Sequence, residues 1–414
     1  MSERTKTEPQ DRDQTDSLTD LIRTGAQQLI AQALKAEVAD LLATYTERRD
    51  DQGRAVVVHN GHQPEREIQT GIGPVTVQVP KVRSRQGEPI TFRSALVPPY
   101  VRKTASLEAA IPWLYLKGIS TGEMQGALEA LVGPEAQGLS ASTVSRLKQV
   151  WREEYTAWQQ RRVDDEQWVY IWVDGIYSGL RAEDHRLCAL VVIGVNARGE
   201  KHFLAMEDGI RESTQSWREV LVGLKARGLT APHLAVGDGA MGFWAALEEL
   251  FPTTRQQRCW CHKTQNILNA LPKSVQPKAK QALQTIWRAE SKALAERAFD
   301  VFLTTYEPKY PKATACLQKD REELLAFYAF PAHHWQRLRT TNPIESTFGT
   351  IRHRTVRTKG CLTRDGLLHM MFKLGQCAEK TWRRLRGFRQ LGKVIRGVQF
   401  RDGLEETTTN SVAA

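Results

Sequence analysis

The sequence is poor in cysteine, has no long apolar run and begins without an apolar leader. Its six cysteines among 414 residues are too few and too scattered for a disulfide framework. The longest apolar run, from Ala189 to Val195, is broken by Gly194 and is far shorter than the roughly 20 residues that cross a bilayer. The polar, acid-containing N-terminus predicts neither a secretion signal nor a transit peptide. These absences exclude disulfide scaffolds and membrane-spanning proteins, and we expect a cytoplasmic location.

Positive charge is the main excess of the composition, and it is clustered. The chain has 58 Lys and Arg against 47 Asp and Glu, a net charge of +11 and a pI near 9.4. Between Arg337 and Arg401 there are 16 basic and three acidic residues, so the rest of the chain is close to neutral. Such a cluster is typical of a protein that neutralises nucleic-acid phosphates. The length predicts two or three domains.

Residues 1–50 are expected to form a disordered start followed by a helical segment. Residues 1–18 show no periodic apolar pattern, which predicts disorder. In residues 19–50 apolar side chains recur at three- and four-residue steps, as in one or two amphipathic helices. Packing or dimerisation is a better explanation of these helices than direct DNA contact.

Residues 51–105 predict a small, basic, β-rich module. Three short apolar segments separated by glycine turns indicate strands over Ala55–Val58, Arg66–Thr70 and Pro74–Val79. A basic run follows them. It is typical of a solvated loop and would also suit contact with a DNA backbone; its cations are Lys81, Arg83 and Arg85.

Residues 106–165 predict a helix-turn-helix. Ser120 can cap a first helix, Gly133-Pro134 ends it, and Ser140 can cap a second. The early turns of the second helix would meet bases or phosphates. Packing of two capped helices explains the pattern equally well. The residues predicted to contact DNA are Ser142, Ser145, Arg146 and Lys148.

From residue 166 to 262 the pattern changes to alternating strands and helices. Three antiparallel strands, a helix, a strand, a helix and a last strand predict an α/β domain with a mixed five-stranded sheet. Residues 263–335 are helical without strand signals, which predicts an all-helical insertion. Residues 336–400 continue the α/β domain as a further helix and the basic tail, and residues 401–414 are expected to be disordered.

Two aspartates follow predicted strands of this sheet. Asp174 ends the strand Trp168–Val173, and Asp238 ends the fourth strand; each precedes a glycine. Carboxylates at strand ends lie where α/β sheets bind ligands, although Asp-Gly is also favourable turn chemistry. Glu345 lies on a later helix, where it would equally complete a capping box with Asn342. Together, the strand order and the three acids describe an RNase H-like nuclease fold whose carboxylates bind two Mg²⁺ ions.

Motifs along the chain resemble those of bacterial insertion-sequence transposases of the Mutator type, a DDE transposase family. The matching segments, which span about residues 20–390, are VPKVRSR, LYLKGISTGEM, LSASTVSRL, YIWVDGIY, VGDGAMGFW, RCWCHKTQNIL and RTTNPIESTFGTIRHRTVRTKG. The resemblance implies that Asp174, Asp238 and Glu345 are the catalytic triad and hold two Mg²⁺ or Mn²⁺ ions per active site. It also implies a bacterial, nucleoid-associated protein.

Two further segments flank these acids. Cys259 and His262 are spaced as half of a zinc site, but no second pair follows at finger spacing, so a structural role is expected; the family carries the same C-x-x-H signature. The segment from Trp382 to Arg389 is as consistent with packing as with a backbone clamp. Basic residues close behind Glu345 are placed to bind phosphates, namely Arg352, Arg354, Arg357 and Lys359.

The sequence thus predicts a metal-dependent DNA transposase. Its partners would be the terminal inverted repeats of the element and target DNA, and joining two ends to one target requires a homodimer or higher oligomer. The alternatives are a non-catalytic, transposase-derived DNA-binding protein and a structure-selective RNase H-like nuclease.

Overall fold

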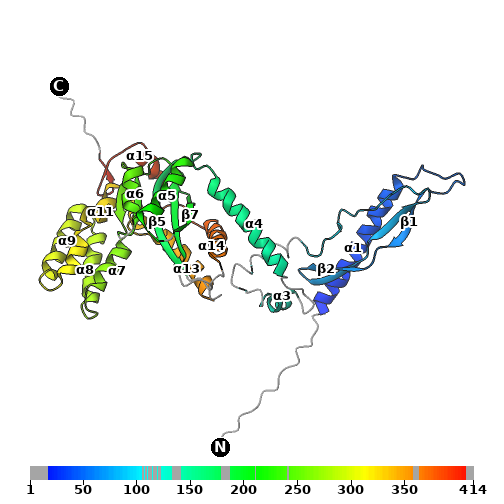
Figure 1. The fold of residues 1–414 in the computed structure, drawn as a ribbon, viewed down its shortest axis with the longest axis horizontal. Helices are drawn as coiled ribbons and strands as arrows, with labels where there is room; N and C mark the ends of the chain where they lie inside the picture. The colour runs from blue at the N-terminus through cyan, green and yellow to red at the C-terminus, as the bar shows by residue number, and fades with distance from the viewer. Residues whose placement is uncertain are drawn as a thin grey trace, which may run out of the picture. The chain divides into compact units, whose positions relative to one another are not determined.

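The structure is a computed structural model that forms two compact units, Met1–Leu147 and Lys148–Ala414 (Figure 1). It describes residues 17–104, 123–132, 141–178, 187–209, 211–239, 242–357 and 363–406, and four single positions between 105 and 122. The side chains of residues 141–145 and 350–357 are not described. Each unit is considered by itself.

The first unit begins with one long helix and four short strands. Helix α1 spans Ser17–Ala43, so the periodic segment forms a single helix. Strand β1 (Val57–His62) pairs with β4 (Pro80–Ser84), and β2 (Arg66–Thr70) pairs with β3 (Gly73–Val77), both antiparallel. A shared apolar core, which includes Leu34 of α1 and valines of the strands, joins the helix to the two sheets.

Strand β4 corrects the sequence prediction. The basic run was expected to lie in a loop, but Lys81 and Arg83 belong to β4, and Arg83 pairs with Val58 of β1. Val82 between them is buried in the module's core, whereas both cations are exposed, as the two-residue period of a strand requires. The short alternation of charged and apolar residues concealed this strand.

Two helices follow where the helix-turn-helix was predicted. Helix α3 spans Met124–Val132, and α4 spans Ala141–Gln160. The predicted turn, residues 133–140, lies outside the described residues. Met124 and Leu128 of α3 are buried in a small cluster with Leu107. The helices are therefore confirmed as elements, and the motif itself stays a prediction.

The second unit contains the expected mixed sheet of five strands, in the order β7-β6-β5-β8-β9. The first three strands pair antiparallel, and β8 and β9 continue the sheet in parallel from β5. The strands are β5 (Trp168–Ser178), β6 (Leu187–Asn196), β7 (Lys201–Gly209), β8 (Leu234–Gly237) and β9 (Arg255–Arg258).

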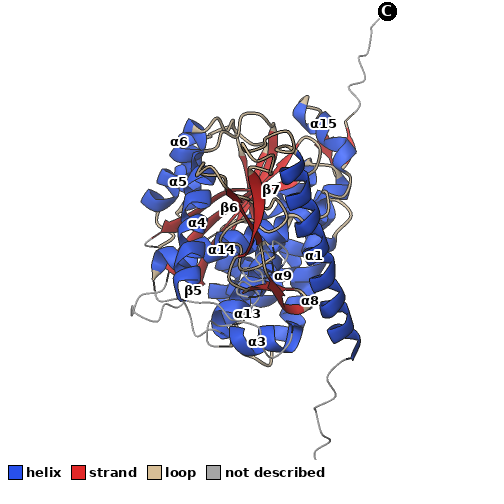
Figure 2. Cartoon of the chain, turned by 90° about the vertical axis from the view of Figure 1, so that its right-hand side faces the viewer, coloured by secondary structure: helices blue, strands red, loops and turns tan. Residues whose placement is uncertain are grey.

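Helices enclose this sheet on both faces, which explains its uninterrupted apolar strands (Figure 2). Every residue of β6 is buried. Helices α5 (Thr214–Ala226) and α6 (Phe243–Leu250) share one core with alternate residues of the strands. Helices α13 (Asn342–Arg357) and α14 (Arg364–Glu379) pack through Phe348 and Gly375 against Phe203 of β7.

The chain between β9 and α13 is entirely helical in the structure, as the sequence predicted. Figure 1 shows α7, α8 and α9 gathered beside the sheet. The α-helices are α7 (Trp260–Asn269), α8 (Gln276–Arg288), α9 (Lys292–Tyr306), α10 (Pro311–Gln318), α11 (Arg321–Leu325) and α12 (Trp335–Leu338). Two 3₁₀ turns, η1 (Ala326–Ala329) and η2 (Ala332–His334), lie before α12.

Short elements complete the second unit after α14. They are η3 (Phe388–Gln390), α15 (Leu391–Ile395), β10 (Phe400–Arg401) and β11 (Leu404–Glu405). Among the helices that the structure describes, none combines the length and apolar character needed to span a membrane.

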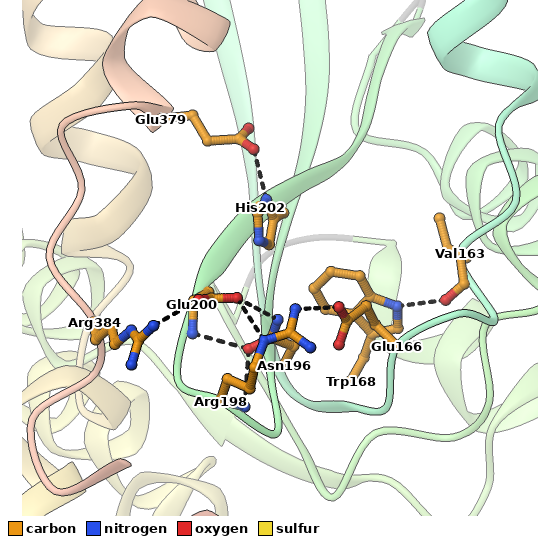
Figure 3. Close-up of polar contacts among 9 residues, drawn as sticks. All are labelled: Val163, Glu166, Trp168, Asn196, Arg198, Glu200, His202, Glu379 and Arg384. Carbon is orange, nitrogen blue, oxygen red and sulfur yellow. Dashed lines mark hydrogen bonds and ion pairs between the residues drawn. The ribbon is translucent and has the colours of Figure 1, made fainter.

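The segment from Trp382 to Arg389 packs against the β6–β7 turn. Leu385 is buried, and its amide donates to the carbonyl of Gly199 at 2.8 Å. Arg384 pairs with Glu200 at 2.9 Å within the network of Figure 3, where Glu379 also reaches His202. The packing explanation of this segment is thus supported.

This network lies at the far end of the sheet from the predicted acids. Asn196 of the β6–β7 turn pairs with Trp168, the first residue of β5. Asp174 is six residues further along β5, about 20 Å away at ~3.3 Å per residue. The ion-paired Arg384 therefore lies at the end of the sheet that is opposite to the predicted acids.

The interior of the sheet provides a test of its packing. A Cβ on Gly194 would lie 2.6 Å from Leu204 Cδ1 and 2.7 Å from Trp168 Cε3, whereas Gly223 on α5 has open space around it. We expect Gly194→Ala to lower the free energy of unfolding by about 1–3 kcal/mol through overpacking. The matched control, Gly223→Ala, should leave it unchanged or raise it by up to about 1 kcal/mol. Urea denaturation measures both; equal effects would contradict the packing.

His334 provides a test by pH. Its Nε2–H donates to the carbonyl of Gly387 at 3.0 Å, so Nδ1 accepts from the hydroxyl of Tyr170, also at 3.0 Å. Burial lowers the pKa of His334 to about 4. The unfolded chain takes up this proton near pH 6.5 and the folded protein does not, so stability is lost as pH falls from 6.5 to 4.

We therefore expect the stability advantage of the wild type over His334→Gln to shrink by about 3 kcal/mol between pH 7 and pH 4. Chemical denaturation across this range measures the difference. Parallel stability curves for the two proteins would show that His334 titrates normally in the fold.

Candidate active site

The sheet register brings the two predicted aspartates to the same level. Strand β5 pairs in parallel with β8 from Tyr170↔Leu234 to Trp172↔Val236. Asp174 and Asp238 each follow the last of these pairs by two residues. They therefore lie at the carboxyl ends of neighbouring parallel strands, where α/β sheets bind ligands.

The structure corrects the predicted end of the first strand. Asp174 was expected to terminate it, but β5 continues to Ser178 because β6 still pairs with it there, with Asp174 opposite Val191. Only the pairing with β8 ends before the aspartate. Asp174 is thus held within the antiparallel pairing of β5 with β6, and it lies beyond the last residue pair that joins β5 to β8.

Asp174 is a crowded carboxylate. Its Oδ1 accepts from the amide of Gly175 at 3.0 Å. Burial, together with the nearby charges of Glu212 and Glu345, raises the pKa of Asp174 to about 7 against the lowering effect of His262. Groups from three other parts of the chain thus act on this side chain.

Asp238 is fixed through its backbone rather than its carboxylate. The indole Nε1 of Trp244, on α6, donates to the Asp238 carbonyl at 2.6 Å. Its Oδ1 is buried and accepts no hydrogen bond from the part of the chain that the structure describes. An acceptor of this kind is unfavourable unless a ligand satisfies it.

Glu345 comes from the first turn of α13. The helix begins at Asn342, one residue earlier than a capping box would require, and the Glu345 amide donates to the carbonyl of Thr341 at 3.1 Å. The Thr341 hydroxyl donates to Glu345 Oε1 at 3.1 Å. The carboxylate is therefore directed toward the site rather than used for capping.

Cys259 and His262 join the acids at the N-terminus of α7. The Cys259 Sγ accepts from the amide of Thr341 at 3.3 Å. His262 Nε2 lies 3.7 Å from Glu345 Oε1, and one ligand atom from each of Cys259, His262 and Glu345 lies within 4.8 Å of the others. The Thr341 contacts tie the start of α7 to the start of α13, and Cys259, His262 and Glu345 are close enough together to hold a metal ion, so the structural role expected of the C-x-x-H segment stays a prediction.

The imidazole of His262 is the centre of this cluster. The adjacent Cys259 side chain raises the pKa of His262 to about 10, helped by the charges of Asp174 and Asp238. Burial of the thiol acts in the opposite direction, but hydrogen bonds from Cys261 and His262 hold the pKa of Cys259 well below its usual value. A positive ring thus lies among the carboxylates.

The donor set of the site fits a divalent cation that prefers oxygen. The charges of Asp174 and Asp238 act on His262, Glu345 Oε1 lies 3.7 Å from its Nε2, and Asp238 Oδ1 has no donor among the described residues. Mg²⁺ and Mn²⁺ select such hard oxygen ligands.

A buried ionic cluster supports the Asp238 loop from the helical region. Asp320 pairs with the ammonium of Lys263 and lies 3.7 Å from Nε of Arg258, and all three side chains are buried. The Arg258 guanidinium lies 3.8 Å from the centre of the Trp244 ring that holds Asp238. A Cβ on Gly239 would lie 3.0 Å from Asp320 Oδ2. Sequence reasoning missed Asp320, since a single acid in a helical region carries no pattern.

The predicted DNA-contacting residues are distributed over several elements of the chain. Lys81, Arg83 and Arg85 are exposed in the first unit, and Arg146 and Lys148 are exposed on α4. The remaining candidates cannot be placed by their side chains. Those of Ser142, Ser145, Arg352, Arg354 and Arg357 fall among the side chains not described, and Lys359 lies outside the described residues.

Comparison with known proteins gives one consistent result. A family model described as "Transposase, Mutator family" matches residues 1–374. The chain is 53% identical over 287 residues, 69% of this chain and 97% of the relative, to the transposase for insertion sequence element IST2 of Acidithiobacillus ferrooxidans. It is 46% identical over 297 residues, 72% and 92% of the two chains, to the transposase for insertion sequence element IS6120 of Mycolicibacterium smegmatis.

The ionic cluster generates a stability prediction. We expect Asp320→Asn to lower the free energy of unfolding by about 3–5 kcal/mol, because it leaves the buried ammonium of Lys263 without its ion-pair partner. Asp300→Asn is the matched control, since it removes the partner of Arg321 in a largely exposed pair and should cost less than about 1 kcal/mol. Guanidinium denaturation measures both. Equal losses would contradict the proposed anchoring.

Proposed function

The chain belongs to the Mutator family of transposases, and we propose that it catalyses divalent-metal-dependent strand cleavage and strand transfer at the terminal inverted repeats of an insertion sequence. The observation that carries this proposal is the convergence of three acids from distant segments. Asp174, Asp238 and Glu345 act on one imidazole, that of His262.

The order of the strands supports an RNase H-like catalytic domain. The first three strands form an antiparallel β7-β6-β5 arrangement, and the fourth and fifth extend it in parallel from the first. The two aspartates belong to the first strand and to the end of the fourth. We assign the helical region from residue 263 to 335 as the insertion that separates Asp238 from Glu345.

Asp174, Asp238 and Glu345 would hold two Mg²⁺ or Mn²⁺ ions. When bound, such ions supply Lewis acidity to the attacking and leaving oxygens of an in-line phosphoryl displacement. The protein contributes rigidity: β6 holds Asp174 within a ladder, Trp244 holds the Asp238 backbone, and Thr341 orients Glu345. Carboxylates fixed in this way need little reorganisation when a phosphate arrives.

The DNA would be delivered by cations outside the carboxylate cluster. Helix α13 carries Glu345 in its first turn and Arg352 two turns later, about 10 Å along the helix. We assign recognition of the inverted repeats to residues 51–165, which include the exposed Lys81 and Arg83 and the predicted helix-turn-helix. Joining two ends to one target would require at least a homodimer on DNA.

The triad can be tested on a duplex that carries the end of the element. We expect Asp238→Ala to reduce Mg²⁺-dependent strand cleavage by at least about 1,000-fold, since roughly 4 kcal/mol of transition-state stabilisation is lost. Binding of the duplex should persist, because the variant removes no cation. Single-turnover cleavage and a mobility-shift assay measure the two effects.

Glu249→Gln is the matched control, because Glu249 is an exposed acid that pairs with Arg218 on the outer side of α6. Undiminished cleavage by Asp238→Ala would exclude the triad. Wild-type binding without cleavage under Mg²⁺ or Mn²⁺ would instead favour a non-catalytic DNA-binding protein, and cleavage without joining to a new strand would favour a structure-selective nuclease.

A further inference from the structure

Glu212 is a fourth acid at the carboxylate cluster. It follows β7 and precedes Ser213, the N-cap of α5, so it belongs to neither of the segments that carry the two aspartates. The sequence offers no signal for it, because an acid just before a helix is ordinary capping chemistry.

The Glu212 carboxyl group lies directly over Gly175, the residue after Asp174. A Cβ on Gly175 would lie 2.3 Å from both Cδ and Oε1 of Glu212, a separation that no pair of non-bonded atoms tolerates. Residue 175 must therefore be glycine for Glu212 to occupy this position. The hydroxyl of Tyr177, two residues further along β5, hydrogen-bonds to the Glu212 side chain.

The backbone of Glu212 contacts the segment that follows Asp238. Its carbonyl accepts from the amide of Gly242 at 3.2 Å. Gly242 is packed equally closely, since a Cβ there would lie 2.2 Å from the amide nitrogen of Thr214. Glu212 thus touches the chain beside both aspartates.

The charge of Glu212 is also part of the cluster. Burial raises its pKa, and the negative charge of Asp238 raises it further, whereas His262 lowers it. Glu212 in turn raises the pKa of Asp174.

We propose that Glu212 is a fourth carboxylate of the divalent-cation site, held against Asp174 by Gly175 and tied to the Asp238 loop by Gly242. This assignment rests on the proposed function of the triad. It makes the absence of a side chain at residue 175 a requirement for cation binding, not only for folding.

Thermal unfolding during a Mn²⁺ titration, without DNA, tests the proposal. In EDTA, Glu212→Gln should melt no lower than the wild type, because the variant removes a repelled charge and keeps the shape. Its Mn²⁺ midpoint should rise about 10- to 100-fold. The matched control, Glu219→Gln, changes an exposed acid of α5 that accepts from Gln215, and its midpoint should not move.

Gly175→Ala provides an independent route to the same result, because it displaces the Glu212 carboxylate while every acid remains. We expect its Mn²⁺ midpoint to rise as well. Glu212→Asp, which retracts the charge by one methylene, replaces Glu212→Gln if that variant does not fold, with the same direction of change.

A lower melting temperature of Glu212→Gln in EDTA with an unchanged Mn²⁺ midpoint would assign Glu212 a merely structural role and overturn the proposal. Asp174→Asn separates this failure from a failure of the proposed function. If Asp174→Asn loses the Mn²⁺ response and Glu212→Gln keeps it, only the fourth carboxylate is wrong; if both keep it, the cation site itself is wrong.

Discussion

The parallel pairing of β5 with β8 is the constraint on which the site depends. It sets Trp172 opposite Val236 and so places Asp174 and Asp238 at one level. A slip of one residue would turn one aspartate to the opposite face of the sheet, since the side-chain period of a strand is two. Because β6 pairs with β5 beyond this level, Asp174 is held between hydrogen-bonded residues, whereas Asp238 lies at the start of a loop.

Gathering acids at this point is unfavourable for the protein alone. Asp174 and Glu212 are both shifted toward protonation by burial and by neighbouring charge, and Asp238 Oδ1 is unsatisfied within the described structure. Local rules of stability are typically broken where function requires it. The compensation comes from His262 inside the cluster and from the ionic group around Asp320 outside it, which fastens the Asp238 loop to the helical region.

The sequence predicted the elements that follow a simple period. The apolar runs at Trp168–Val173 and in β6 predict strands, which the structure confirms; Asp174 lies within β5, and Asp238 directly follows β8. Strand β4 was missed because its charged residues alternate with a buried valine. Glu212 and Asp320 were missed for a different reason: each reaches the site through a tertiary contact, with Gly175 and Gly239 respectively, that leaves no local pattern.

Helix α13 carries an acid near its first residue and arginines near its last. An acid in the first turn and arginines in the last turns are what the helix dipole favours in any helix. The charges of α13 therefore do not by themselves indicate DNA. The distinguishing feature is the use of Glu345: its carboxylate accepts from the Thr341 hydroxyl and lies beside His262 instead of completing a capping box with Asn342. One helix thus sets the distance between Glu345 and the basic positions behind it, so a phosphate bound at those positions would have a defined position relative to the Glu345 carboxylate.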